Sequence, residues 1–288
     1  MNNAELYQNS NSLQKRDALE CLQEYSRKIK WKNDASVIDI GCGDGSVTTA
    51  ILKKFLPKCM EVVGCDISEK MVQFANKNFS SESTSFIVLD IEGNLPDQMR
   101  AEFDHAFSFY TLHWVKHAFR NIYDLLQEGG NCFHIFLGHM PLFDVFRILA
   151  RRSRWSYWLR DVDKFVSPYH DSQVIFFILI LVGFTNVDVQ YKPKSFIYNS
   201  LEAVKKAVKA VNPFKIPDEM HEELLEDYIG IVRDMQLIDM DNDNLDHSVT
   251  VRTNYNLIIA YGEKIESINN LLSLQPLCSI MTIDFYMD

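Results

Sequence analysis

The chain has 288 residues, of which 47% are hydrophobic and 12% aromatic, enough for one large domain or for one domain that carries an insertion. Its formal net charge of −10 argues against a nucleic-acid partner, because phosphate binding needs clustered Lys and Arg, and against binding to an anionic membrane surface. The polar N-terminus predicts no signal peptide. The longest apolar run, residues 174–184, is too short to cross a bilayer and predicts a buried helix rather than stable membrane insertion.

The cysteines form no CxxC pair and show no metal-ligand spacing, which predicts no metal site. Several of them lie inside apolar runs, where a reduced thiol behaves as a small hydrophobic side chain. This usage favours a reducing compartment, and we expect a cytoplasmic protein. The six positions are Cys21, Cys42, Cys59, Cys65, Cys132 and Cys278.

The first half of the chain predicts alternating helices and strands. A helix over residues 12–29, with Ser12 as the expected N-cap, opens the series. The expected strands cover residues 36–40, 61–65, 85–89, 103–109 and 131–137. The expected helices between them cover residues 46–55, 69–78 with Ser68 as the cap, and 117–126, ended by Gly129-Gly130. This alternation indicates right-handed crossovers and a mostly parallel sheet with helices on both faces.

The pattern changes after residue 138. Residues 141–169 are rich in aromatic and arginine side chains without a clear strand, which indicates a helical insertion. A helix over 174–183 and a sixth strand over 186–191 resume the crossover pattern. A broken helical stretch over 201–238 and an acidic loop at 239–246 then precede a last strand over 248–261. We therefore predict a core of residues 1–138, 171–200 and 248–265, a helical cap of 139–170 and 201–247, and a tail of unknown structure over 266–288.

The most informative motif is the glycine-rich turn VIDIGCGDGS at residues 37–46, directly after an apolar strand and before a helix. It lacks the Gly-Lys-Ser/Thr ending of a phosphate-binding P-loop, and its GxGxG spacing differs from the GxGxxG of dinucleotide-binding proteins. Asp39, two residues before the first glycine, would repel a pyrophosphate. It suits instead the ammonium and sulfonium groups of S-adenosylmethionine.

Acidic residues follow the next two strands as well. Asp66 ends the second strand, where it can accept hydrogen bonds from ribose hydroxyls, and Asp90-Ile91 ends the third, where an adenine would lie. Each acid alone could be a loop residue or a helix cap, but three in register point to one crevice. The chain thus resembles the class I methyltransferases, which implies a Rossmann-like α/β fold with S-adenosylmethionine as cofactor and S-adenosylhomocysteine as product. The expected cofactor-binding residues are Asp39, Gly41, Cys42, Gly43, Asp66, Ile67, Asp90, Ile91 and Phe109.

Five further stretches sharpen the resemblance: LYQNSNSLQKRDA (6–18), FDHAFSFYTLHWV (103–115), GHMPLFDVFR (138–147), FVSPYHD (165–171) and AVNPFKIP (210–217). Together they are similar to the insect juvenile hormone acid O-methyltransferases, particularly those of moths, over residues 1–261. That family transfers a methyl group to the carboxylate of juvenile hormone acids or farnesoic acid in juvenile hormone biosynthesis. The resemblance implies that Gln14 and Trp114 are the catalytic pair that holds the substrate carboxylate.

The chemistry of a carboxylate acceptor agrees with these two residues. A carboxylic acid with a pKa of about 4 is already ionised at neutral pH, so no general base is required. The enzyme then has only to align the carboxylate with the methyl group of the cofactor. A side-chain amide and an indole N–H can hold the carboxylate without adding a counter-ion that would lower its nucleophilicity. His113 is then a neighbour of the pocket, whereas a hydroxyl acceptor would require it as a base. Without the resemblance, Gln14 would be read as a solvent residue and Trp114 as a core residue.

The insertion supplies the apolar surface that a long isoprenoid chain requires. The alternative is that its rings pack the cap onto the core. The expected substrate pocket comprises Gln14, His113, Trp114, Phe143, Phe146, Trp158 and Tyr169.

Two regions depart from the family pattern. Residues 172–181 are shorter and almost wholly apolar where relatives carry a charged amphipathic helix, and residues 266–288 have no recognised counterpart. Two alternatives therefore stay open beside methylation of a small hydrophobic terpenoid acid. One is a methyltransferase for another small carboxylic acid. The other is a weakly active or inactive paralogue that binds the cofactor and a terpenoid. The sequence also leaves a homodimer open.

Overall fold

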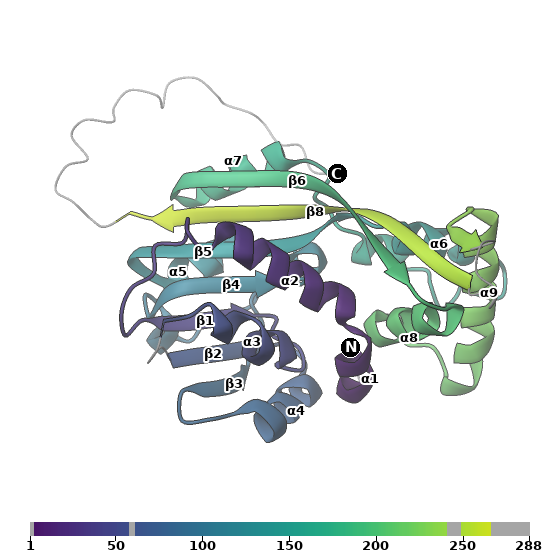
Figure 1. Ribbon diagram of the computed structural model, residues 1–288, viewed down its shortest axis with the longest axis horizontal. Helices are drawn as coiled ribbons and strands as arrows, with labels where there is room; N and C mark the ends of the chain where they lie inside the picture. The colour runs from purple at the N-terminus through teal and green to yellow at the C-terminus, as the bar shows by residue number, and fades with distance from the viewer. Residues whose placement is uncertain (1–2, 58–60, 241–248, 266–288) are drawn as a thin grey trace.

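A computed structural model describes residues 3–57, 61–240 and 249–265 of the chain. The expected tail over 266–288 and most of the expected acidic loop lie outside these residues. The described strands form one sheet in the order β3-β2-β1-β4-β5-β8-β6, and β7 pairs with β8 (Figure 1). All pairings among the first five strands are parallel, and β8 lies antiparallel between β5 and β6. The predicted α/β architecture with a mostly parallel sheet is confirmed.

The bounds of the strands follow the apolar runs of the sequence. The eight strands are β1 (Ser36–Ile40), β2 (Glu61–Asp66), β3 (Thr84–Val88), β4 (Phe103–Phe109), β5 (Leu126–His139), β6 (Phe184–Tyr198), β7 (Ile238–Met240) and β8 (Val249–Lys264) in the described chain. Two predicted strands, β1 and β4, are confirmed to the residue.

Helices cover both faces of the sheet. On one face, α2 (Ser12–Tyr25) and α3 (Ser46–Ala50) pack in a cluster with Phe107 and Phe133, and α4 (Glu69–Phe79) packs beside α3. On the other face, α5 (Ala118–Leu125) and α7 (Ser172–Val182) pack in a cluster with Phe136. Phe133 and Phe136 belong to opposite clusters because successive side chains of β5 point to opposite faces.

The cap has an apolar cluster of its own, which includes Phe146, Trp155 and Tyr228. Its helical segments are α6 (Pro141–Ala150), η4 (Val162–Phe165), α8 (Leu201–Val211), η5 (Asp218–Met220) and α9 (His221–Asp234). Strands β6 and β8 run from the sheet into this region, so they join cap and core (Figure 1). The exact division of the chain into core and cap stays a prediction.

The start of the chain differs from the prediction. The expected helix over 12–29 ends at Tyr25, and a separate helix, α1 (Ala4–Ser10), precedes it. Ser12 is not the N-cap: that position is Asn11, whose side chain makes no capping hydrogen bond. Its amide Nδ2 donates instead to Ser46 Oγ at 3.0 Å, which ties α2 to the start of α3. By contrast, Ser68 accepts from the Met71 N–H and caps α4 as predicted.

Long-range pairing also moves several other boundaries. The Gly129-Gly130 pair lies inside β5 rather than before it, because Leu126 already pairs with Phe103 and the register then shifts. Strand β6 is longer than predicted, since it pairs with β8 along its whole length. Its Pro193 is tolerated because β6 lies at the edge of the sheet. The predicted helix over 46–55 is divided into α3 and the short η1 (Leu52–Lys54).

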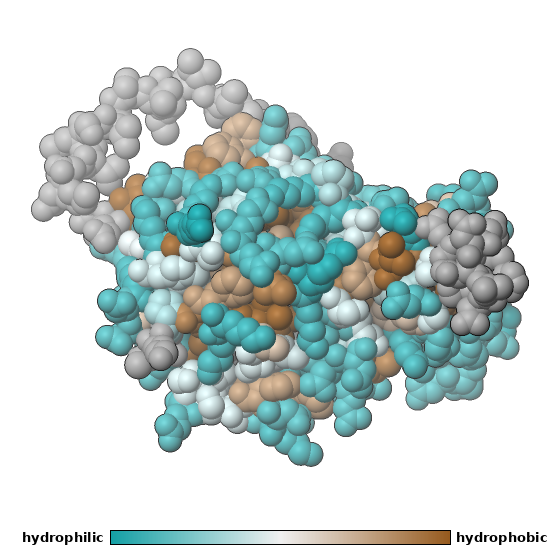
Figure 2. Space-filling view, in the orientation of Figure 1, coloured by the Kyte–Doolittle hydropathy of each residue, from teal (hydrophilic) through white to brown (hydrophobic). Residues whose placement is uncertain are grey.

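The apolar run over 174–184 is helical as far as Val182, where α7 ends, but the helix is not buried on all sides, so that part of the prediction is wrong. In α7 only Ile175 and Leu179 are fully buried, and Leu181 is 79% exposed. Apolar side chains are accordingly visible at the surface over α7 (Figure 2). Among the described residues, no helix has the length and apolar character needed to cross a membrane.

Candidate active site

The glycine-rich turn leaves β1 at the carboxyl edge of the sheet. Gly41 has a φ of +71°, and a Cβ at this position would lie 2.0 Å from Thr111 Oγ1, so only glycine fits. The Gly41 and Cys42 N–H groups donate to the Cys65 carbonyl at 2.7 and 2.9 Å. These contacts bring the ends of β1, β2 and β4 together at one crevice.

Two buried carboxylates of this crevice each have an oxygen without a protein partner. Asp39 is 1% exposed; its Oδ2 accepts from Thr48 Oγ1 at 2.5 Å, and its Oδ1 has no partner among the described residues. Asp44 is fully buried; its Oδ1 accepts from Ser46, and its Oδ2 likewise has no described partner. Burial raises the pKa of Asp39 to about 7 and also raises the pKa of Asp44. Buried acids with free oxygens fit a cationic group such as an ammonium.

The end of β2 fits a ribose and a base. Asp66 accepts from the Gly43 N–H at 3.0 Å and from the Ser68 N–H at 2.8 Å, so each oxygen keeps a lone pair for a hydroxyl. Ile67, the next residue, is 68% exposed, which is unusual for a large apolar side chain and suits contact with a flat base. The expected cofactor residues at this position are therefore placed at the crevice.

The other expected cofactor-binding residues are either exposed or packed into the apolar core. Asp90 is exposed at the end of β3, and its Oδ1 accepts from the Glu92 N–H at 2.9 Å. The side chains of Cys42, Ile91 and Phe109 are each 6% exposed and belong to apolar clusters of the core. These three residues thus support the crevice through packing.

The structure adds Tyr7 of α1, which sequence reasoning did not single out. A Cβ on Gly43 would lie 3.6 Å from its ring, so Tyr7 covers the glycine turn. Burial, together with the nearby Asp44, Asp66 and Asp39, raises the pKa of its hydroxyl well above the usual value. Tyr7 lies within the stretch LYQNSNS that carries the family resemblance, and this was its only signal in the sequence. Asp44 was not among the expected cofactor-binding residues, although its position in the glycine-rich turn could have indicated it.

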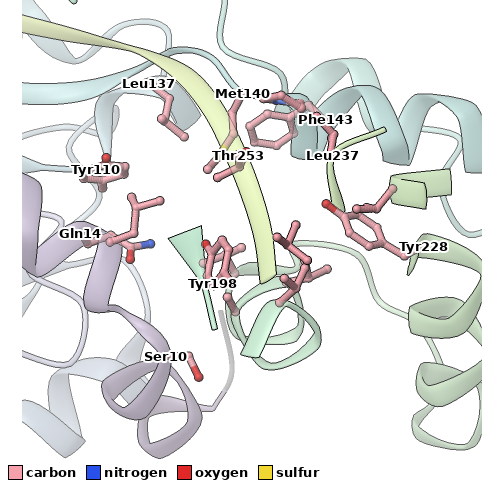
Figure 3. Close-up of a pocket in the computed structure, with 18 of the residues that line it drawn as sticks. Ser10, Gln14, Tyr110, Leu137, Met140, Phe143, Tyr198, Tyr228, Leu237 and Thr253 are labelled. Carbon is pink, nitrogen blue, oxygen red and sulfur yellow. The ribbon is translucent and has the colours of Figure 1, made fainter. Parts of the chain in front are cut away.

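A cavity of about 860 Å³, including its open mouth, lies between the crevice and the cap. One side is formed by Gln14 of α2, Tyr110, and His113 and Trp114 of η3 (Leu112–Trp114). Figure 3 shows Gln14 and Tyr110 on this side and the cap residues opposite them. The apolar residues that the cap contributes are Met140, Pro141, Phe143, Val204, Ala207, Val208, Val211, Val232 and Leu237. No charged side chain is among the described residues that line the cavity.

Gln14, Trp114 and His113 place polar atoms on the side of the cavity next to the crevice. Gln14 Oε1 is buried without a hydrogen-bond partner among the described residues. The Trp114 ring lies 4.8 Å from the His113 ring and 5.5 Å from the Phe143 ring, so packing fixes its orientation. His113 Nδ1 accepts from the Leu137 N–H at 3.5 Å, and burial lowers its pKa to about 3. His113 is therefore a neutral neighbour of the site.

Of the expected pocket residues, Gln14, His113, Trp114 and Phe143 come together, and three others do not. Phe146 is 1% exposed and packs against Phe214 and Tyr228 in the cap. Trp158 packs against the same cluster and Tyr157. Tyr169 lies on the other face of the sheet, where its hydroxyl donates to the Val115 carbonyl at 3.1 Å. The alternative interpretation, that these rings pack within the cap and core rather than line the substrate pocket, describes these three residues.

A buried carboxylate one helical turn after Gln14 holds α2 in place. Asp17 is fully buried and accepts from the Tyr110 hydroxyl at 2.5 Å and the Tyr255 hydroxyl at 2.6 Å. It also pairs with Arg16 at 2.9 Å and with Lys194 at 3.1 Å. These contacts connect α2 to the end of β4 and to β6 and β8. They fix the helix that presents Gln14.

Comparison with known proteins agrees with this geometry. Residues 37–130 match the family model described as "Methyltransferase domain". Over 274 residues, the chain is 52% identical to juvenile hormone acid O-methyltransferase from Bombyx mori, an alignment that covers 92% of this chain and 98% of that protein. The enzyme of the same name from Drosophila melanogaster is 38% identical over 290 residues, covering 96% of this chain and 97% of that protein.

Solved structures share the fold at low sequence identity. The YcgJ protein from Bacillus subtilis is 17% identical with a TM-score of 0.55, covering 86% of this chain and 99% of that one. Phosphoethanolamine N-methyltransferase 2 from Haemonchus contortus, solved with S-adenosyl-L-methionine, is 16% identical with a TM-score of 0.53, covering 87% of this chain and 53% of that one. These likenesses bear on the fold, whereas the two insect enzymes match nearly the whole chain. The chain belongs to the juvenile hormone acid O-methyltransferase family.

Proposed function

We propose that this enzyme transfers the methyl group of S-adenosylmethionine to the carboxylate of a juvenile hormone acid or of farnesoic acid, giving the methyl ester in juvenile hormone biosynthesis. The observation that carries the proposal is the cavity. It starts at the amide of Gln14 and the ring of Trp114, beside the glycine turn, and continues between mostly apolar side chains. A long, mostly apolar acid whose carboxylate lies at the Gln14 end fits this distribution of polarity.

The residues around the glycine turn fit the cofactor. Asp39 and Asp44 would hold the ammonium group, Asp66 the ribose hydroxyls and Ile67 the base, while Tyr7 covers the turn and excludes water. When bound, S-adenosylmethionine supplies an electrophilic methyl group on its sulfonium.

The cavity residues act on the acceptor. The amide of Gln14 and the indole N–H of Trp114 donate to the substrate carboxylate and orient one oxygen toward the crevice. Neither carries a charge, so the carboxylate keeps its nucleophilicity. Orientation of bound groups is worth at most roughly 7–11 kcal/mol of the barrier. Neutral His113 takes no proton, because an ionised carboxylate has none to give.

The expected compartment and partners form part of the same proposal. The described cysteines Cys21, Cys42, Cys65 and Cys132 are buried free thiols, which suits the reducing cytoplasm. Cys59 and Cys278 lie outside the described residues. The net charge of −10 supports a small-molecule substrate rather than a nucleic acid.

A methyl-transfer assay against a panel of acids tests the proposal. The panel contains farnesoic acid, a juvenile hormone acid, fatty acids of similar length and small polar acids. We expect turnover of the terpenoid acids to exceed that of the others. Preferential turnover of a small polar acid would favour a methyltransferase for another acid. Calorimetric binding of farnesoic acid without turnover would favour an inactive binding protein.

The activity of a His113→Asn variant distinguishes a carboxylate acceptor, which needs no base, from a hydroxyl acceptor, which does. Because burial lowers the pKa of His113 to about 3, its ring stays neutral above that pH. At saturating S-adenosylmethionine, whose ammonium group would keep Asp39 ionised, rates between about pH 6 and 9 should therefore be flat, since the free acceptor acid does not titrate there. His113→Asn retains an acceptor for the Leu137 N–H and should lose well under about tenfold in kcat, whereas loss of a general base costs about 10²–10⁴-fold. Steady-state rates across this range provide the measurement. A loss of about 10²-fold or more in a His113→Asn variant that is folded and binds the cofactor as the wild type does would contradict a carboxylate acceptor.

A further inference from the structure

One tyrosine hydroxyl lies on the side of the cavity opposite Gln14. Tyr228 of α9 contributes to the cavity wall, and its hydroxyl points into the cavity (Figure 3). The side of its ring packs in the cap, 5.6 Å from the Phe146 ring. The residue is 4% exposed, so the hydroxyl has little contact with solvent.

No described residue forms a hydrogen bond with this hydroxyl. Because this hydroxyl has no partner in the described part of the chain and faces the cavity (Figure 3), a ligand that enters the cavity can supply the missing hydrogen-bond partner. Packing does not explain the oxygen, because phenylalanine would fill the same space within the cap. Burial raises the pKa of Tyr228 well above its usual value, so the group remains an uncharged O–H donor.

The surroundings define the chemistry of the missing partner. The nearby cap wall contains Val208, Val232 and Leu237, and no described lining residue is charged. A charged ligand group would have no counter-ion here and would be expensive to desolvate. The partner is therefore an uncharged oxygen that accepts a hydrogen bond, such as an ether, an epoxide or a carbonyl oxygen.

We propose that Tyr228 is a specificity-determining residue that binds an uncharged oxygen at the chain end of the substrate, opposite the carboxylate held by Gln14 and Trp114. This inference rests on the proposed function and makes it more specific. The preferred substrate is a terpenoid acid with polar atoms at both ends, and its fully hydrocarbon counterpart is the poorer substrate.

The experiment compares farnesoic acid with its terminal epoxide in the wild type, in Tyr228→Phe and in Tyr157→Phe. For the wild type we expect kcat/KM to be between about threefold and tenfold higher for the epoxide, the effect of one neutral hydrogen bond. Tyr228→Phe should bring this ratio close to one. Tyr157 is the matched control, because it is a tyrosine of the same region that is 63% exposed and lies outside the cavity wall. Tyr157→Phe should keep the wild-type ratio.

The same two acids are titrated calorimetrically into each protein in the presence of S-adenosylhomocysteine. A ratio of dissociation constants that follows the same pattern supports the role of Tyr228 even if turnover is absent, and absent turnover would count against the proposed function alone. The inference is overturned if the wild type shows no preference for the epoxide. It is also overturned if Tyr228→Phe, folded and binding cofactor as the wild type does, keeps the preference.

Discussion

Gln14→Ala and Trp114→Ala should each lower kcat/KM for methyl transfer by roughly 10- to 100-fold and leave the affinity for S-adenosylmethionine nearly unchanged. The reason is that each variant removes one donor to a charged carboxylate, and such a hydrogen bond is worth about 1.5–3 kcal/mol. Both side chains line the acceptor cavity, whereas Asp39 and Asp44 of the glycine turn are not among its described lining residues. Initial rates with farnesoic acid and calorimetry with the cofactor measure the two quantities separately.

Two further variants sharpen this test. Trp114→Phe keeps a ring against Phe143 but removes the indole N–H, so a loss close to that of Trp114→Ala would assign the effect to the donor. Asp66→Ala is the opposite case: it should weaken cofactor binding by about 1.5–3 kcal/mol, because two ribose hydroxyls lose a charged acceptor. Loss of cofactor affinity in Gln14→Ala, or an unchanged cofactor affinity in Asp66→Ala, would show that these roles are misassigned.

The largest loss of stability is expected from Asp17→Ala, at about 3 kcal/mol in the free energy of unfolding. The carboxylate is fully buried and compensates Lys194, whose side chain is 17% exposed, and Arg16, whose side chain is 33% exposed. Removing Asp17 leaves the hydroxyls of Tyr110 and Tyr255 without their acceptor, and it leaves Lys194 and Arg16 with only the exposed Glu20 as a counter-ion among the described residues. Urea unfolding followed by circular dichroism measures the change.

Glu20→Ala provides the matched control for this prediction. Glu20 pairs with the same Lys194, at 2.6 Å, and with Arg16, at 3.8 Å, but its side chain is 50% exposed. An exposed pair contributes only about 0–1 kcal/mol, so this variant should be nearly as stable as the wild type. Equal losses in the two variants would mean that burial of Asp17 is not the source of the stability. Since Gln14 lies one turn away, Asp17→Ala should also lower kcat more than Glu20→Ala does.

Local sequence patterns are enough to predict the central sheet and the crevice at the glycine-rich turn. Strands such as β1 and β4 are short apolar runs, and the turn between β1 and α3 requires glycine at Gly41 for reasons of backbone geometry. Each of these features depends on residues a few positions apart, so it can be read without knowing the fold. Once the strands are parallel, their carboxyl ends must meet, and Asp39 and Asp66 must face one crevice.

Which side chains form the substrate cavity, and which contacts support it, depends on long-range packing that local patterns do not specify. Phe143 lines the cavity and Phe146 does not, although they are three residues apart on α6, because the placement of that helix against α9 selects the face it presents. The Asp17 network joins residues separated by up to 238 positions. Tyr228 reaches the cavity only through the packing of the cap. Such contacts depend on where distant segments meet, which local pattern and propensity do not specify.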